Sequence, residues 1–481
     1  MAKVYLIYID INTGYFPGLH HGLASLAAAI RHGGHNLRFH HLSVEEPYDS
    51  ICDKVNQFQP DIIGFSVTTN QKMYLGKYSD AIYKKNKAPQ VVGGVHATVA
   101  PDDAFSLSAI QGVCVGEGEQ SFVGLLNKLD TQSSLLDTPG FWWRAAGRDI
   151  QKNPVPELIR DLSDLPYPDY SIFDTKTINE RNSGWMDMMV TRGCPYSCFY
   201  CCNHALRSIY PNKEDYVRFA PVKHAIGIIK HNLSIHPGVK GITFSDDLLV
   251  LNKKWFKEFM DIYSREIKLP FICNARVEHL TEEICALLKQ GNCACVRIGL
   301  ESGSEWVRKN ILNRQMSNEQ IIRAFSLLKK FKIPTFSFNI IGFPFETKEL
   351  MRQTLLLNKR IKPEWGMVYY FYPYPGTQIY SICEKFGLLD KSSNELSSYL
   401  EGPAINLSHC TLGDCRKFYY KIRFYLLSRF VTKDIKLFRN LFQMIIYLFF
   451  NLHPAFFAKI FTKKTKIKQV LRKIGYNKML R

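Results

Sequence analysis

Three cysteines on one short segment constrain this 481-residue chain more than any other feature of its sequence. The segment reads Thr191-Arg-Gly-Cys194-Pro-Tyr-Ser-Cys198-Phe-Tyr-Cys201, so its thiols follow a Cys-x3-Cys-x2-Cys spacing. Thiolates are soft ligands that favour iron–sulfur clusters, zinc or Cu(I). Three thiolates on a 4Fe-4S cluster leave one iron free to bind a substrate or cofactor. The segment therefore predicts a loop that must bring its thiols together around a reactive metal centre.

A structural zinc site is the alternative for this loop. Such a site normally uses four ligands in paired Cys-x2-Cys spacings. Cys202 or His204 could supply a fourth ligand, but the adjacent Cys201 and Cys202 do not easily converge on one ion with the others. Since no second Cys-x2-Cys pair follows, the spacing favours a cluster over zinc.

The cysteine loop resembles that of the radical SAM enzymes. The resemblance implies that Cys194, Cys198 and Cys201 hold a 4Fe-4S cluster. It also implies that the free iron chelates the amino and carboxylate groups of S-adenosylmethionine (SAM). Tyr200, the aromatic residue before the last cysteine, is then expected beside the adenine.

Three downstream segments, residues 241–247, 296–303 and 338–344, read as strands that end where the family contacts SAM. After the first of these strands, Asp246 and Asp247 are expected near the methionine amino group. Glu301, at the end of the second, is expected near the SAM ribose or carboxylate. In the third, Ile340 and Gly342 are expected along the adenine. Arg276 follows another strand. It could contact the SAM carboxylate or form an ordinary salt bridge within the protein, and both alternatives remain open.

Residues from about 186 to 380 alternate short apolar runs with amphipathic stretches such as 318–331, which is typical of parallel strands with crossover helices. The resemblance specifies an incomplete (β/α)6 barrel for this region. The motif residues fall at the carboxyl ends of its strands, where barrel enzymes place their chemistry.

The N-terminal part repeats a strand-then-helix pattern of its own. Five apolar strands with intervening helices predict a doubly wound α/β domain, whose ligand lies beyond the carboxyl ends of the strands at the topological switch point. The expected strands are residues 4–9, 36–42, 60–66, 90–94 and 112–116, and the first helix spans 20–32.

These strand ends resemble the cobalamin-binding domains that precede many radical SAM barrels. Glycine permits close backbone approach and hydroxyls can reach polar atoms of the cofactor, although simple turn chemistry is the alternative for each residue. The residues that the resemblance assigns to cobalamin are Ser66, Thr68, Gly93, Gly94, Gly116 and Glu117.

The chain departs from the usual cobalamin-binding pattern in the loop that normally supplies a ligand to the lower face of the cobalt. Cobalamin modules often carry Asp-x-His-x-x-Gly after the first strand, whereas this chain has Asp10-Ile-Asn12-Thr-Gly14. His20 and His21 begin the following helix and come late for this role. The resemblance therefore implies cobalamin bound base-off, without a histidine ligand from the protein.

Charge is concentrated at the C-terminus. Residues 416–481 carry 17 Lys and Arg against one Asp, which accounts for +16 of the net charge of +19. Basicity spread over the whole chain would suggest nucleic acid. Because this charge flanks the uncharged stretch 440–458, we expect no nucleic-acid partner. An interfacial membrane helix within 436–481 and a buried C-terminal helix both remain open, while Asn451, His453 and Pro454 disfavour a membrane span.

The domains predicted from these patterns are a cobalamin-binding-like domain (1–140), a linker (141–185), the radical SAM barrel (186–395) and a helical, basic C-terminal region (396–481). The chain has 13 cysteines and no recognisable signal peptide. This combination predicts a cytoplasmic protein, with membrane association through the tail as a further expectation.

The resemblance implies a cobalamin-dependent radical SAM enzyme, in the group that includes methyltransferases and the anaerobic magnesium-protoporphyrin monomethyl ester cyclase. In this group a 5'-deoxyadenosyl radical abstracts hydrogen from an unactivated carbon, which then takes a methyl group from methylcobalamin. An electron donor such as flavodoxin or ferredoxin is implied as well.

The aromatic strand 365–376 and the basic, apolar tail favour a lipid, polyprenoid or tetrapyrrole substrate. No single tyrosine of that strand is marked as catalytic. A cyclase or other radical rearrangement with the same cofactors is the alternative activity. A regulatory protein that binds cobalamin or SAM is the alternative outside the enzymes.

Overall fold

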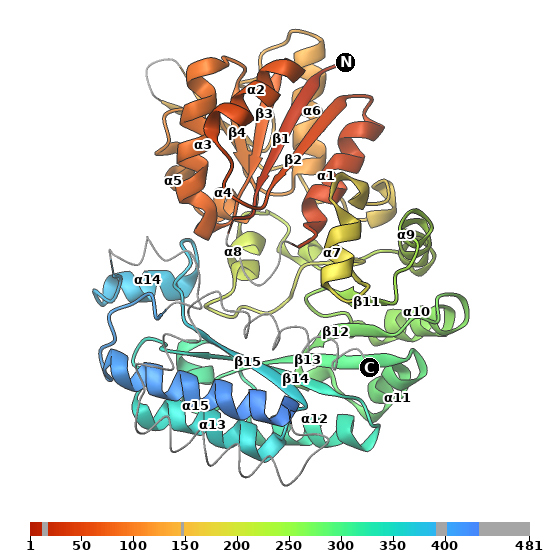
Figure 1. The fold of residues 1–481 in the computed structure, drawn as a ribbon, viewed down its shortest axis with the longest axis vertical. Helices are drawn as coiled ribbons and strands as arrows, with labels where there is room; N and C mark the ends of the chain where they lie inside the picture. Colours follow the sequence, from red (N-terminus) through yellow and green to blue (C-terminus); the bar gives the residue numbers. More distant parts are fainter. Residues whose placement is uncertain (12–17, 146–148, 391–401, 432–481) are drawn as a thin grey trace. The chain divides into compact units, whose positions relative to one another are not determined.

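The computed structural model describes residues 1–11, 18–145, 149–390 and 402–431 (Figure 1). The chain forms two compact units. The first contains residues 1–178, 187–238 and 373–385. The second contains residues 179–186, 239–372 and the described residues from 386 onwards.

A seven-stranded sheet in the order β2-β1-β3-β4-β5-β6-β7 forms the centre of the first unit. Strands β1 to β5 pair in parallel, and β6 and β7 extend the sheet antiparallel. The order reverses between β1 and β3, which is the predicted switch point. The strands are β1 (Lys3–Ile9), β2 (Asn36–Leu42), β3 (Ile62–Ser66), β4 (Gln90–Gly93), β5 (Gly112–Cys114), β6 (Phe141–Arg144) and β7 (Ile150–Lys152).

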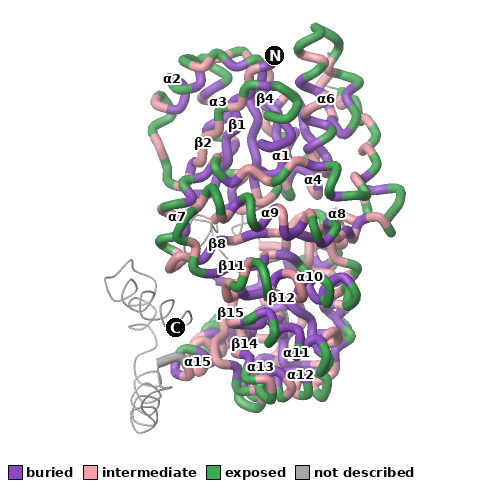
Figure 2. Tube along the Cα trace, turned by 90° about the vertical axis from the view of Figure 1, so that its right-hand side faces the viewer, coloured by how far each residue is buried: buried purple, intermediate pink, exposed green. Residues whose placement is uncertain are grey.

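Helices cover both faces of this sheet, as Figure 1 shows. Because β1 lies between two helical layers, nearly all its residues are apolar and buried (Figure 2). α1 and α6 pack together, as do α2 and α3. The helices are α1 (His21–His32), α2 (Tyr48–Phe58), α3 (Lys72–Lys85), α4 (Val95–Val99), α5 (Pro101–Phe105) and α6 (Gly118–Asp130).

Shorter elements complete the first unit. A two-stranded ribbon pairs β9 (Thr191–Arg192) with β10 (Arg218–Phe219) antiparallel. The helices here are α8 (Cys202–Ser208), α9 (Val222–Ile235) and α14 (Gln378–Lys385), and α7 (Thr175–Arg181) leads from this unit towards the second.

The second sheet follows the chain order, β8-β11-β12-β13-β14-β15, with parallel pairing from β11 to β15. Successive strands lie side by side with crossover helices between them, so the predicted partial barrel is confirmed. The strands are β8 (Trp185–Met188), β11 (Gly241–Phe244), β12 (Phe271–Ala275), β13 (Cys293–Glu301), β14 (Thr335–Ile341) and β15 (Trp365–Tyr370). The helices are α10 (Lys253–Glu266), α11 (Glu282–Gln290), α12 (Asn318–Lys330), α13 (Lys348–Ile361) and α15 (Leu412–Val431).

Local sequence explains where these crossover helices begin. Asn252, Thr281 and Thr347 accept a backbone N–H at the starts of α10, α11 and α13. Ser317 and Gln320 form a reciprocal capping box at the start of α12. Such caps satisfy N–H groups that would otherwise lack partners, which fixes where each helix starts.

α15 packs on β15 and α13 (Figure 1), with Tyr419 stacked on Tyr370 at 4.2 Å between ring centroids. Among the described residues, no helix is both long and apolar enough to cross a membrane. Residues 432–481, which include the predicted interfacial segment, lie outside the described part of the chain.

Candidate functional site

The three predicted cluster cysteines lie on the loop between β9 and α8. Cys198 is buried, and Cys194 and Cys201 are half-buried. Gly193 starts the loop with φ of +83°, and a Cβ atom there would lie 2.2 Å from the Tyr216 carbonyl oxygen. Only glycine fits this position, so the Gly-Cys dipeptide fixes where the loop begins.

Side chains that follow the loop hold it in place. Arg207 on α8 donates to Ser197 Oγ over 2.7 Å. Asn203 Nδ2 lies 3.8 Å from Cys201 Sγ, and its Oδ1 accepts the Tyr216 hydroxyl over 2.8 Å. An amide donor beside sulfur favours the thiolate form that a cluster needs.

No three His, Cys, Asp or Glu side chains in the described ranges converge closely enough to hold one metal ion. A single ion needs all its ligands around one point, whereas each thiolate of a 4Fe-4S cluster binds a different iron. Three thiols on one glycine-started loop, with an amide donor at Cys201, therefore fit a cluster. Tyr200 lies on the same loop, half-buried.

Asp246 and Asp247 follow β11 in the second unit and differ in exposure. Asp246 is fully buried, while Asp247 is exposed. The Asp246 carbonyl oxygen accepts Asn274 Nδ2 over 2.9 Å, so the neighbouring strand β12 fixes this turn. Of the two carboxylates, Asp246 is the one placed inside the protein.

Glu301 ends β13 in a strained conformation. Its φ is +61°, which non-glycine residues rarely adopt, and its side chain is nearly buried. Arg314 lies 3.9 Å from the Glu301 carboxylate and donates to the Gly299 carbonyl over 2.7 Å. A Cβ atom at Gly299 would lie 2.3 Å from Glu301 Oε1, so this glycine makes room for the carboxylate. Strain of this kind at a strand end is typical of functional positions.

Arg276 follows β12 and pairs with Glu278, whose Oε1 lies 3.2 Å from Arg276 Nε. Burial opposes ionisation of Glu278, but the hydrogen bond and charge of Arg276 hold its pKa below the ordinary value. The structure therefore has the salt bridge that was the alternative to a SAM contact.

Gly342 follows β14 with φ of +83°. The N–H groups of Gly342 and Phe343 donate to one oxygen of Glu346, over 2.7 and 3.2 Å. Glu346 is buried, and burial raises its pKa to about 8. One buried side chain thus shapes the turn after β14. Ile340 is half-buried near the end of the same strand.

Most residues assigned to cobalamin gather at the carboxyl edge of the first sheet. Ser66 pairs in register with Gly93 on the adjacent strands β3 and β4. Gly94 has φ of +95°, and a Cβ atom there would lie 3.0 Å from Ser66 Oγ. Thr68 follows two residues after Ser66. Hydroxyls and closely packed glycines beside the switch point fit a large polar cofactor at this edge.

Gly116 and Glu117 follow β5 at the same edge. A Cβ atom at Gly116, whose φ is +96°, would lie 2.8 Å from the Tyr210 hydroxyl, so this glycine is needed to accommodate a protein side chain. The Glu117 carboxylate is bound by Arg192 over 2.8 Å and by Arg218 over 3.1 Å. The side chain of Glu117 therefore serves the protein's own arginines.

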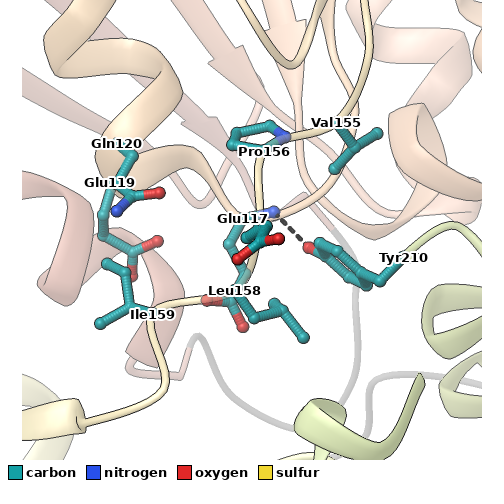
Figure 3. Close-up of a pocket in the computed structure, with 9 residues that line it drawn as sticks. Glu117, Glu119, Gln120, Val155, Pro156, Leu158, Ile159 and Tyr210 are labelled. Atoms are coloured by element: carbon teal, nitrogen blue, oxygen red, sulfur yellow. Dashed lines mark hydrogen bonds between the residues drawn. The ribbon is translucent and has the colours of Figure 1, made fainter. Parts of the chain in front are cut away.

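Figure 3 shows the pocket beside Glu117. The cavity volume that water-sized spheres can occupy is only about 10 Å³, and segment 155–159 forms one wall. Ligand pockets usually span roughly 300–1,000 Å³. The pocket is too small for cobalamin or a large substrate.

The two histidines after the first loop have structural partners. His20 accepts the Leu23 N–H and caps α1, and burial lowers its pKa to about 4. His21 Nδ1 lies 2.7 Å from the Tyr170 hydroxyl, and burial lowers its pKa to about 3. Residues 12–17, which include most of the loop after β1, lie outside the described residues.

Sequence reasoning did not single out several residues that organise the site. They come from segments far apart along the chain. The sequence patterns that could have pointed to them are the Gly-Glu-Gly-Glu run at 116–119 and the Thr-Arg-Gly-Cys run at 191–194. These residues are Glu119, Arg192, Arg207, Tyr210 and Arg218.

Comparison with protein families gives two matches, in the expected order. The radical SAM superfamily model matches residues 188–357. The B12 binding domain model matches residues 9–126.

Known proteins resemble the chain across both regions. An uncharacterised methyltransferase of Pyrococcus horikoshii is 28% identical over 86% of this chain and 89% of its own length. The anaerobic magnesium-protoporphyrin IX monomethyl ester cyclase of Rubrivivax gelatinosus is 24% identical over 69% of this chain and 60% of its own length. A solved structure of the cobalamin-dependent S-adenosylmethionine radical enzyme OxsB has a TM-score of 0.69 at 17% identity, covering 99% of this chain and 72% of that one. At this identity, the likeness to OxsB shows a shared fold.

Proposed function

Because this chain belongs to the radical SAM enzymes that carry an N-terminal cobalamin-binding domain, we propose that it methylates an unactivated carbon of a large apolar substrate. Its cofactors are a 4Fe-4S cluster, SAM and cobalamin. When bound, the cluster and SAM supply a 5'-deoxyadenosyl radical that removes a hydrogen atom, and cobalamin supplies the methyl group.

The chain's own residues have distinct roles in this proposal. The glycine-started loop presents three thiols as cluster ligands, and the strand ends of the second sheet bind and orient SAM. The strand ends of the first sheet hold cobalamin. The proposed cluster ligands are Cys194, Cys198 and Cys201; the SAM-binding residues are Tyr200, Asp246, Asp247, Glu301, Ile340 and Gly342; the cobalamin-binding residues are Ser66, Thr68, Gly93, Gly94 and Gly116, with the backbone of Glu117.

The proposed substrate class rests on the alternation of buried polar and half-buried apolar side chains along β14. Ser337 and Asn339 are buried and hydrogen-bonded to Asn358 of α13, whereas Phe336, Phe338 and Ile340 alternate with them and are half-buried. Side chains alternate between the faces of a strand, so these apolar residues lie on the face away from α13.

Tyr369 of β15 stacks on Phe338, with ring centroids 6.4 Å apart. Half-buried aromatic rings on neighbouring strands give an apolar wall suited to a lipid, polyprenoid or tetrapyrrole. The Pyrococcus relative, named a methyltransferase, supports methyl transfer.

Product analysis tests the activity. We expect anaerobically purified protein, supplied with cobalamin and reductant, to form both 5'-deoxyadenosine and S-adenosylhomocysteine from SAM. With methyl-labelled SAM, label should enter one of three offered extracts: lipid, polyprenoid or tetrapyrrole. Cys198→Ala should abolish both products, and the matched variant Cys202→Ala should retain them. Unchanged SAM cleavage in Cys198→Ala, or fewer than about three irons per wild-type chain, would contradict the cluster assignment.

A cyclase or other radical rearrangement is the second candidate, supported by the resemblance to the Rubrivivax cyclase. It predicts 5'-deoxyadenosine without S-adenosylhomocysteine. A regulatory protein that binds the same cofactors predicts neither product under reducing conditions.

We also propose that an acidic electron donor such as flavodoxin or ferredoxin docks near the cysteine loop. The pKa of His204 supports this. It is lowered mainly by burial and further by the positive charges of Arg207 and Lys213, so both cations lie near the loop. Positive charge near a redox centre attracts acidic partners and raises the association rate. Reduction by flavodoxin should therefore slow in a Lys213→Gln variant, which leaves the contact between Arg207 and Ser197 intact, and become less sensitive to salt.

A further inference from the structure

Two arginines face each other across the ribbon that leads into the cysteine loop. Arg192 of β9 is the register partner of Arg218 of β10. Like charges directly opposite each other destabilise a strand pair. The ribbon therefore needs a counter-charge at this point.

Glu117 supplies that counter-charge from the edge of the first sheet. One carboxylate oxygen lies 2.8 Å from Arg192 Nη1 and 3.1 Å from Arg218 Nη1, and the other oxygen accepts Arg218 Nη2. The Arg218 side chain is only 4% exposed. Charge-assisted contacts of this kind are strong because the buried guanidinium groups have few alternative partners.

Further contacts complete the arrangement on both sides of Glu117. Arg192 Nη2 donates to Glu119 over 2.6 Å and to Ser25 Oγ over 2.9 Å. Burial opposes ionisation of Glu119, but the charge and hydrogen bond of Arg192 hold its pKa below the ordinary value. The Glu117 N–H lies 2.8 Å from the Tyr210 hydroxyl, shown as the dashed line in Figure 3. Both the backbone and the side chain of Glu117 are therefore fixed.

The arginine held by Glu117 lies two residues before Cys194, with only Gly193 between them. Because Gly193 packs closely against Tyr216 and is the only residue between them, we expect the position of Arg192 to influence that of Cys194. The Glu117 carboxylate thus binds the residue that directly precedes the Gly-Cys start of the cysteine loop.

We propose that Glu117 is a positioning residue that ties the cysteine loop to the cobalamin-binding edge through Arg192 and Arg218. Its significance for catalysis rests on the proposed function, in which cobalt and cluster act on one substrate. Its effect on the loop itself is a property of the protein without cofactors.

Cysteine alkylation in the cofactor-free, reduced full-length chain tests this effect. N-ethylmaleimide is added in a short pulse, and modification is quantified by mass spectrometry at Cys198 in the loop and at Cys52 in the core of the first sheet. Both thiols are buried, so each must open before it reacts. We expect Glu117→Gln to raise the Cys198 rate by roughly tenfold, since a charged hydrogen-bond pair is lost, and to leave Cys52 unchanged.

Glu157→Gln is the matched control, because Glu157 lines the same pocket but is exposed and forms none of these ion pairs. If Glu117→Gln does not fold, Arg192→Lys keeps the charge but loses the fork that spans Glu117 and Glu119, and should raise the Cys198 rate selectively. An unchanged Cys198 rate, or equal increases at Cys198 and Cys52, overturns the proposal.

Spectroscopy of the reconstituted protein separates positioning from simple stability. We expect Glu117→Gln to alter the electron paramagnetic resonance spectrum of the reduced cluster, Glu117→Asp to restore it in part, and Glu157→Gln to match the wild type. An unaltered Glu117→Gln spectrum overturns the positioning role. If the wild type takes up no cluster, the proposed function is wrong. The alkylation experiment on the cofactor-free chain still tests the effect of Glu117 on the loop.

Discussion

At the scale of single residues, Glu346 couples the turn after β14 to pH. Its pKa of about 8 lies above its ordinary value because the carboxyl group is buried. A raised pKa in the folded state means that folding takes up a proton, so this group's stabilising contribution is present at low pH and is lost as pH rises towards 8.

A neutral replacement should remove this dependence. Between pH 5.5 and 8, the free energy of unfolding of the wild type should fall relative to Glu346→Gln by roughly 1 kcal/mol per pH unit, as measured by urea unfolding. Glu349→Gln is the control, because Glu349 is exposed on α13 and bonded only to Arg352. Parallel pH profiles for wild type and Glu346→Gln would show that Glu346 is ionised in the folded protein.

Sequence reasoning identified residues whose role is local and missed those whose role depends on distant partners. The cysteine loop could be predicted because its three thiols and Gly193 lie within nine residues. Glu117 was assigned to cobalamin by its place after a strand, yet its carboxylate binds Arg192 and Arg218, which are 75 and 101 residues away. Nothing in the spacing of these residues indicates that the ribbon carries both arginines to one carboxylate.

At the scale of elements, runs of buried apolar residues made most strands predictable. The first three expected strands of the N-terminal domain agree closely with β1, β2 and β3. Strands β6 and β7 were not predicted as part of this sheet. Both are short: β6 alternates buried with half-buried residues, and β7, at the edge of the sheet, has no buried residue, so neither has the continuous apolar run of a central parallel strand.

Helix α15 contributes to the stability of the second sheet through one face. Ile422 is fully buried against β15, whereas Leu427 on the same helix is exposed. Ile422→Ala should lower the free energy of unfolding by about 2–5 kcal/mol, because it leaves a cavity in a packed core. Leu427→Ala should change it by less than about 0.5 kcal/mol. Equal effects of the two substitutions in urea unfolding would contradict the packing of this helix.

At the scale of the whole molecule, charge divides the chain unevenly. Residues 1–415 carry a net charge of only +3, although they contain both matched domains. The tail from 416 onwards carries +16, and residues 436–481 contribute 11 Lys and Arg without an acid. We propose that this concentrated charge, next to an uncharged apolar stretch, binds an anionic membrane surface; a buried C-terminal helix is the alternative.

Deleting residues 436–481 would lower the net charge from +19 to +8 and remove the apolar stretch 440–458 with its basic flanks. We expect the full chain to sediment with vesicles containing phosphatidylserine and to be released as salt rises, because each Lys or Arg near such a surface contributes about 1 kcal/mol and salt screens the attraction. The deletion should abolish sedimentation but leave SAM cleavage intact, since the proposed cluster and cofactor residues all precede it. Vesicles of phosphatidylcholine alone are the control for apolar insertion. Undiminished sedimentation of the shortened chain would place the membrane-binding surface elsewhere, and no sedimentation of the full chain would favour the alternative of a buried C-terminal helix.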